Sequence, residues 1–203
     1  MSAREAILGR LARPVPADLA RQAAALVVDP ERPPIAPGDI ADRFVAQLAM
    51  PSVAATVDRI GSLSHLPAAV TAYLDHHRLP RALYLPPDPV LTMCDWHGFS
   101  ISDAAASDQN AALAGAIAGV AETGSLIFAT TPNAPMLPNF LTLHHLVVLQ
   151  RNRLVETLED APRDLPNARA LYWVTGVSGT TDIEGQYVRG AHGPRFLHVF
   201  LVG

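Results

Sequence analysis

The sequence predicts an α/β protein in which helices cover both faces of a mostly parallel sheet. Residues 54–60 alternate as a strand does, residues 62–77 have the period of an amphipathic helix, and residues 81–85 form a short apolar run bounded by prolines. This β-α-β order is typical of a parallel sheet with helices on its faces. Roughly seven strands that alternate with helices are expected over the chain.

The other expected elements follow from the same periodicities. Helices are expected at residues 39–49, briefly at 153–158, and at the Ala-rich residues 109–120, where Gly115 and Gly119 are spaced for close packing. Further strands are expected at residues 126–130, 146–149, 170–174 and 196–202.

The N-terminal part of the chain differs from the rest in composition. Residues 2–13 are expected to form a helix, and a Pro-rich stretch from 14 to 37 follows, interrupted by a short helix at 17–28. We therefore divide the chain into an N-terminal helix and Pro-rich arm, residues 1–38, and an α/β domain, residues 39–203. The arm is either a tether or a segment that packs against a partner subunit.

The composition excludes several classes of protein. With 203 residues and 49% apolar content, the chain is long enough for one well-buried domain. The net charge of −4 and the absence of a basic block argue against nucleic acid as a partner. No apolar run approaches the roughly 20 residues that span a bilayer, and no signal peptide is evident, so we expect a cytoplasmic protein without a transmembrane segment.

The cysteine and histidine content argues against a metal site in this chain. Cys94 is the single cysteine, which excludes an iron–sulfur or zinc site built from cysteines of this chain alone. The adjacent pairs His76–His77 and His144–His145 lack the spacing of a zinc site, so no metal ligand is assigned. We expect the Cys94 thiol to be inert.

The first candidate patch is the turn at residues 121–125. Glu122, beside Thr123 and Gly124 in a turn between an expected helix and an expected strand, has the character of a nucleophile or a general base at a sheet edge. The alternative is a helix C-terminus with Gly124 as its left-handed terminator, although the helix dipole disfavours a glutamate there.

The second candidate patch is residues 175–184, which are rich in hydroxyl groups and glycine. Ser178 and Thr180 are suited to donate hydrogen bonds to an anion, and Asp182 and Glu184 add two carboxylates. The Gly-x-Ser-x-Gly spacing of hydrolases fails because Gly179 directly follows Ser178, and neither standard nucleotide fingerprint is present. The alternative is a helix whose N-cap is Thr181 or Asp182.

A third patch is the loop at residues 190–194, Gly-Ala-His-Gly-Pro. Its glycines and proline hold His192 in a rigid frame, which favours a functional role over that of a surface histidine. Arg189 and Arg195 flank the loop and make it locally cationic in an acidic chain.

Taken together, these motifs resemble those of the LUD domain, and in particular the lactate-utilisation protein C family. The resemblance rests on Ala-Glu-Thr-Gly-Ser at 121–125, on Gly-x-Ser-x-Thr-x-Asp-Ile-Glu at 176–184, and on Gly-x-His-Gly-Pro at 190–194 before a terminal apolar strand. Val177 stands where the family commonly has proline. The resemblance implies a Rossmann-like fold of the NagB/RpiA/CoA-transferase-like group.

The resemblance also implies a function. It indicates a bacterial system that oxidises L-lactate to pyruvate, in which partner subunits carry iron–sulfur clusters and this chain carries none. We expect the chain to bind a small organic acid or an anionic cofactor of unknown identity at the carboxyl edge of the sheet. The residues assigned are Glu122, Asp182 and His192 for catalysis, and Thr123, Gly124, Ser178, Thr180, Glu184, Arg189 and Arg195 for substrate binding.

Two other functions remain open at this point, and whether the chain is an enzyme by itself is undecided. The chain could be a stand-alone enzyme on a phosphorylated or CoA-linked substrate, with Glu122 or Asp182 catalytic. Alternatively, it could be a non-catalytic assembly factor whose Pro-rich arm docks the iron–sulfur subunits. Formation of a homo-oligomer is compatible with each of these functions.

Overall fold

A computed structural model describes residues 3–11, 17–28, 34–104, 106, 109–181 and 184–203. The chain divides into two compact units, Met1–Ile35 and Ala36–Gly203. The first unit holds helices α1 (Ala3–Leu11) and α2 (Ala17–Val28), where the sequence predicts helices. All side chains described in these two helices are exposed. The domain boundary after residue 38 stays a prediction.

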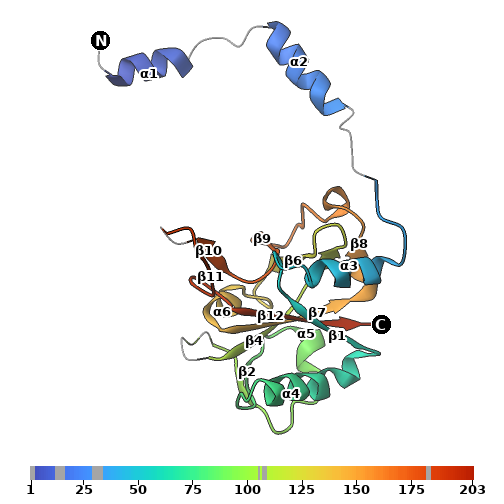
Figure 1. Cartoon of the computed structure of the whole chain (residues 1–203). Helices are drawn as coiled ribbons and strands as arrows, with labels where there is room; N and C mark the ends of the chain where they lie inside the picture. The colour runs from blue at the N-terminus through green and yellow to red at the C-terminus, as the bar shows by residue number, and fades with distance from the viewer. Residues whose placement is uncertain (1–2, 12–16, 29–33, 105, 107–108, 182–183) are drawn as a thin grey trace. The chain divides into compact units, whose positions relative to one another are not determined.

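A six-stranded parallel sheet forms the centre of the second unit, which confirms the predicted fold class (Figure 1). The neighbouring strands are all parallel. In spatial order they are β1 (Thr56–Ile60), β12 (Phe196–Val202), β7 (His144–Gln150), β4 (Ala111–Gly115), β2 (Ala82–Tyr84) and β3 (Ser100–Ser102).

Helices cover both faces of this sheet, as Figure 1 shows. Helix α3 (Ile40–Leu48) packs on one face, where Asp39 caps it by accepting hydrogen bonds from the Ala41 and Asp42 amides at 2.9 and 3.3 Å. Helix α4 (Leu66–His76), which follows the turn η1 (Leu63–His65), packs on the other face together with α5 (Pro89–Thr92).

A second, four-stranded sheet shares the face of α3. Its spatial order is β8 (Leu154–Val155), β5 (Ala118–Val120), β6 (Ser125–Thr130) and β9 (Ala170–Val174). The sheet is mixed, because β5 pairs with β8 in parallel whereas β6 pairs with both β5 and β9 in antiparallel. The α3 face of the central sheet is therefore covered by strands as well as by a helix.

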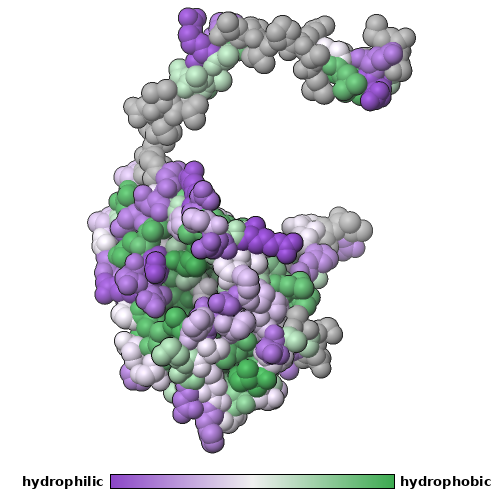
Figure 2. Space-filling model, turned by 180° about the vertical axis from the view of Figure 1, so that it is seen from behind, coloured by the Kyte–Doolittle hydropathy of each residue, from purple (hydrophilic) through white to green (hydrophobic). Residues whose placement is uncertain are grey.

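Side chains alternate between the two faces of each central strand, so a hydrophobic core lies on each face of the sheet. Along β7, Val147 and Leu149 point toward α3, whereas Leu146 and Val148 point toward α4. Because both faces of the strand are buried, its sequence is a continuous apolar run, as expected for a central parallel strand. On the face drawn in Figure 2, hydrophobic residues are interspersed with hydrophilic ones.

Shorter elements complete the unit. A helix α6 (Leu137–Leu141) precedes β7, and the 3-10 turns η2 (Arg151–Arg153) and η3 (Leu158–Asp160) flank β8. Strands β10 (Gly179–Thr181) and β11 (Tyr187–Arg189) pair in antiparallel as a small two-stranded sheet. Within the described residues, no helix is both long and apolar enough to cross a bilayer.

Two predicted helices are wrong. The Ala-rich residues 109–120 form strands β4 and β5, because alanine's helix propensity is a weak preference that burial in a sheet overrides. A Cβ at Gly119 would come within 2.6 Å of Leu149 Cδ2, so this glycine does serve close packing, but between two sheets. The expected helix at 153–158 is instead the end of η2, strand β8 and the start of η3.

Candidate functional site

The loop that carries His192 lies at the amino edge of the central sheet. His192 and Arg195 directly precede β12, as Leu143 precedes β7 and Asn110 precedes β4. Because these strands are parallel, their amino ends share one edge. The expected position at the carboxyl edge is therefore wrong for these residues, since their place is fixed by the start of β12.

Two of the three sequence motifs meet at this edge. The Ser178 amide donates to the Pro194 carbonyl at 2.9 Å, and the Gly190 amide donates to the Ser178 carbonyl at 2.7 Å. A Cβ at Gly193 would lie 3.2 Å from Ser178 Oγ, so the glycine lets the serine approach the loop closely. The structure thus brings Ser178 and the His192 loop together.

A pocket of about 470 Å³ opens beside this loop. The exposed His192 lines it, as do the exposed Asn110 and the chain between α6 and β7. The Arg195 guanidinium lies 5.8 Å from the centre of the Phe196 ring and makes no ion pair with any described residue. The lining residues are Gln109, Asn110, Phe140, Leu141, Thr142, Leu143, Gly190, Ala191, His192 and Gly193.

The other residues of the second motif lie on the two-stranded sheet of β10 and β11. Thr180 pairs with Val188, and Arg189 pairs with Gly179 and donates to the Pro51 carbonyl at 3.4 Å. Because Thr181 belongs to a strand, the alternative in which it caps a helix is wrong. Glu184 is exposed between the strands, and Asp182 lies outside the described residues.

The Glu122 patch forms the turn between β5 and β6. Gly124 has the predicted left-handed conformation, with φ of +70°, but the turn joins two strands, so the reading as a helix terminus is wrong. The Glu122 carboxylate is exposed and accepts a hydrogen bond from the Leu158 amide at 3.1 Å. Among the described residues, no hydrogen bond links Glu122 to Ser178 or to His192.

A chain of hydroxyl groups connects this turn with the start of the second motif. Thr123 Oγ1 lies 2.7 Å from Ser125 Oγ, which lies 2.6 Å from Thr175 Oγ1. The next residue, Gly176, packs against the backbone of Val53, where a Cβ would come within 2.5 Å of the carbonyl oxygen. The motifs therefore form one continuous stretch of structure, with Glu122 outside the His192 pocket.

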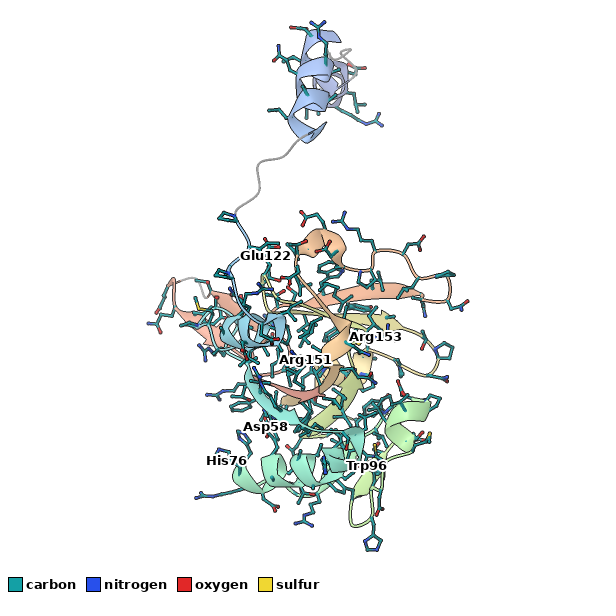
Figure 3. The ribbon with its side chains drawn as sticks, turned by 90° about the vertical axis from the view of Figure 1, so that its right-hand side faces the viewer. Asp58, His76, Trp96, Glu122, Arg151 and Arg153 are labelled. Atoms are coloured by element: carbon teal, nitrogen blue, oxygen red, sulfur yellow. The ribbon has the colours of Figure 1, made fainter. Side chains whose placement is uncertain are left out.

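The opposite, carboxyl edge of the sheet carries two adjoining pockets that the sequence motifs did not indicate. Figure 3 faces this edge and labels Arg151 and Arg153, which follow β7. Arg151 lines a pocket of about 660 Å³, and Arg153 lines one of about 380 Å³ together with Asp88. In the sequence, only the positions of Arg151, Arg153 and Asp88 indicate these pockets. Each of the three residues follows a predicted strand, and the carboxyl end of that strand lies at this edge of the sheet.

Three buried histidines lie within the central sheet. His144 Nδ1 lies 2.9 Å from the Tyr73 hydroxyl, and His198 Nδ1 lies 2.7 Å from Thr56 Oγ1. Burial lowers the pKa of His144, of His145 and of His198 to about 4. No group of three or more potential metal ligands gathers anywhere in the described part of the chain.

Comparison with known proteins agrees with the resemblance noted in the sequence. Residues 102–202 match the LUD domain family. A "Lactate utilization protein C" from Deinococcus radiodurans is 31% identical over 112 residues, which cover 51% of this chain and 51% of that protein. The chain thus matches about half the length of this relative.

A solved structure shares the fold. The crystal structure of a DUF162 family protein from Deinococcus radiodurans superposes with a TM-score of 0.57 and 18% identity, covering 82% of this chain and 100% of that one. The parallel sheet with helices on both faces defines an α/β domain with a pocket at the amino edge of its sheet. By its sequence match and its fold, the chain is a LUD-domain protein.

Proposed function

We propose that this chain acts in a lactate-utilisation system, as a subunit or accessory protein that binds a small organic acid or another anion. One observation carries the proposal: the LUD match over residues 102–202, together with 31% identity to a protein named for lactate utilisation. The proposed partners are the iron–sulfur subunits of a system that oxidises L-lactate.

The proposed binding site is the pocket beside His192. Its surroundings suit a small carboxylic acid, because Arg195, two residues after the lining Gly193, has no carboxylate partner among the described residues and can pair with one from a ligand. The His192 imidazole and the Asn110 amide add groups that exchange hydrogen bonds. Ser178 supports the loop through its backbone hydrogen bonds to Pro194 and Gly190.

Growth on lactate tests the proposal. A bacterial strain that lacks its own protein of this type is complemented with the wild-type chain, with His192→Gln or with Arg195→Gln, and grown on L-lactate or on pyruvate. We expect the wild type to restore growth on lactate and the two variants to fail. His97→Gln, an exposed histidine on another loop, is the matched control and should restore growth.

Capture of partner subunits from the same strains separates the possible roles. A variant that still captures the iron–sulfur subunits but does not support growth indicates that the pocket binds a required ligand. If both variants grow as the wild type does, the pocket has no such role and the chain acts as an assembly factor. If the wild-type chain itself is dispensable on lactate, the proposed pathway is wrong.

A further inference from the structure

The topology of the central sheet opens a crevice between the carboxyl ends of β2 and β4. From β2 the chain continues to α5, on the face of α4, whereas from β4 it continues to β5, on the face of α3. The two neighbouring strands are paired only at Tyr84 and Ala112, so they diverge beyond this point. Connections that leave adjacent parallel strands on opposite faces create the crevice in which open α/β sheets bind ligands.

The crevice is a defined pocket with polar groups at its rim and apolar walls. Its volume of about 380 Å³ lies within the range of roughly 300–1,000 Å³ that small-molecule sites occupy. The polar side chains come from Asp88, after β2, and from Gln150 and Arg153, after β7. The remaining lining residues are Leu63, Val90, Leu91, Gly115, Ala116, Ile117, Val148, Pro162 and Leu165.

Arg153 supplies a cation that no residue in the described part of the chain neutralises. Four other arginines of this unit are each paired with a carboxylate: Arg43 with Glu156, Arg59 with Asp42, Arg81 with Asp75 and Arg151 with Asp39. Arg153 is exposed in the crevice and makes no ion pair or side-chain hydrogen bond with any described residue. Its guanidinium is therefore available to an anionic group of a ligand.

Asp88 supplies a fixed acceptor. Its Oδ1 accepts hydrogen bonds from the Val90 and Leu91 amides at 2.8 and 3.3 Å, which hold the side chain in place. Its Oδ2 has no hydrogen-bond partner among the described residues and lies 3.8 Å from the position of a Cβ on Gly115. Because Gly115 has no side chain, the floor beneath this oxygen stays open.

We propose that this crevice binds a small anion that carries a hydroxyl group and an apolar body. Arg153 pairs with the anionic group, Asp88 Oδ2 accepts a hydrogen bond from the hydroxyl, and the apolar walls hold the body of the ligand. The crevice lies at the opposite edge of the sheet from the His192 pocket, so this site does not depend on the lactate proposal. A hydroxycarboxylate and a hydroxyl-bearing phosphate share this chemistry.

Calorimetric titration of the full chain with two probes tests the proposal. Mandelate presents a carboxylate, an adjacent hydroxyl and a phenyl ring, whereas AMP presents a phosphate, ribose hydroxyls and a base. We expect at least one of them to bind, and which one binds identifies the anionic group as carboxylate or phosphate. Phenylacetate, which is mandelate without its hydroxyl, should bind more weakly than mandelate if mandelate binds.

Substitutions of Arg153 and Asp88 test whether the probe binds in the crevice. Arg153→Gln should weaken the bound probe by about 10- to 100-fold, the range expected for loss of a charge-assisted hydrogen bond. Asp88→Asn should weaken a hydroxylated probe but not phenylacetate, and it keeps the α5 cap because asparagine also caps helices. Arg59→Gln, an exposed arginine outside the crevice, and His192→Gln are the controls and should bind as the wild type does.

One further variant guards against a failure to fold. Gly115→Ala adds a methyl group whose nearest neighbour lies at 3.8 Å, an ordinary contact, so the fold is retained while the floor of the crevice is filled. With an unchanged melting temperature it should weaken the probe. Binding of neither probe to the wild type, or equal binding by wild type, Arg153→Gln and Asp88→Asn, would overturn the proposal.

Discussion

The three histidines buried in the sheet make the folded chain sensitive to mild acid. His144, His145 and His198 are each no more than 3% exposed, and burial lowers the pKa of each from 6.5 to about 4. Between these values the unfolded chain binds protons that the folded chain does not bind. Stability is therefore complete above about pH 6.5 and is lost as the pH falls toward about 4.

His145 gives the clearest magnitude, because burial alone accounts for its lowered pKa. Its ring packs 5.4 Å from that of Phe128, inside the α3 face of the sheet. Linkage gives a loss of about 1–2 kcal/mol from this residue at about pH 5.5, rising to about 3 kcal/mol near pH 4. Similar losses from His144 and His198 would bring the total to roughly 4 kcal/mol at about pH 5.5, a large share of the stability of a typical domain.

Urea unfolding followed by circular dichroism between about pH 8 and pH 5 measures this effect, in a range above the titration of ordinary carboxylates. Between about pH 8 and pH 5 the free energy of unfolding of His145→Leu should fall by about 2 kcal/mol less than that of the wild type, because the variant lacks the buried imidazole. The exposed His97→Gln should follow the wild-type curve. Equal losses for the wild type and His145→Leu, or a wild type with flat stability, would refute the reasoning.

Two further predictions concern packing near the amino edge and in the core. Gly176→Ala combines φ of +93° with a Cβ 2.5 Å from the Val53 carbonyl oxygen, so it should lower the free energy of unfolding by about 2 kcal/mol or more. Gly185→Ala is the control, because Gly185 also has a positive φ, +80°, but has open space around the position of a Cβ. An equal loss in the free energy of unfolding for the two variants would show that the contact with Val53 does not matter. Phe44→Ala in α3, where the side chain is fully buried, should cost about 3–5 kcal/mol in the same assay, and a cost below about 1 kcal/mol would contradict the packing of α3 on the sheet.

The periodicity of apolar residues predicted an element correctly where the pattern is compatible with only one type of secondary structure. The amphipathic period of residues 62–77 and the apolar run of residues 196–202 became α4 and β12 with little change. The Ala-rich residues 109–120 were misread because alanine suits both a helix and a close-packed strand. Only the neighbours of β4 and β5 decide between the two, and two of these neighbours, β7 and β8, are distant in sequence.

The candidate site was predictable to the extent that motifs identify it. The hydrogen bonds of Ser178 to the His192 loop agree with the motif reading, because both segments precede β12 and are tied to it. The predicted edge of the sheet was wrong, because His192 and Arg195 precede the strand at 196–202 and therefore lie at its amino end. Asp88 and Arg153 belong to no motif, so only the strand order makes them neighbours.

The place of β12 in the sheet has a consequence for how the chain is made. β12 comes last in sequence among the six strands, yet it lies between β1 and β7, and Thr56 meets His198 across a separation of 142 residues. During synthesis, β1 and β7 therefore leave the ribosome before β12, the strand with which both of them pair, has been made. Such delayed pairing slows folding and exposes strand edges to other chains, so the nascent chain should depend on chaperones until residue 202 has left the ribosome.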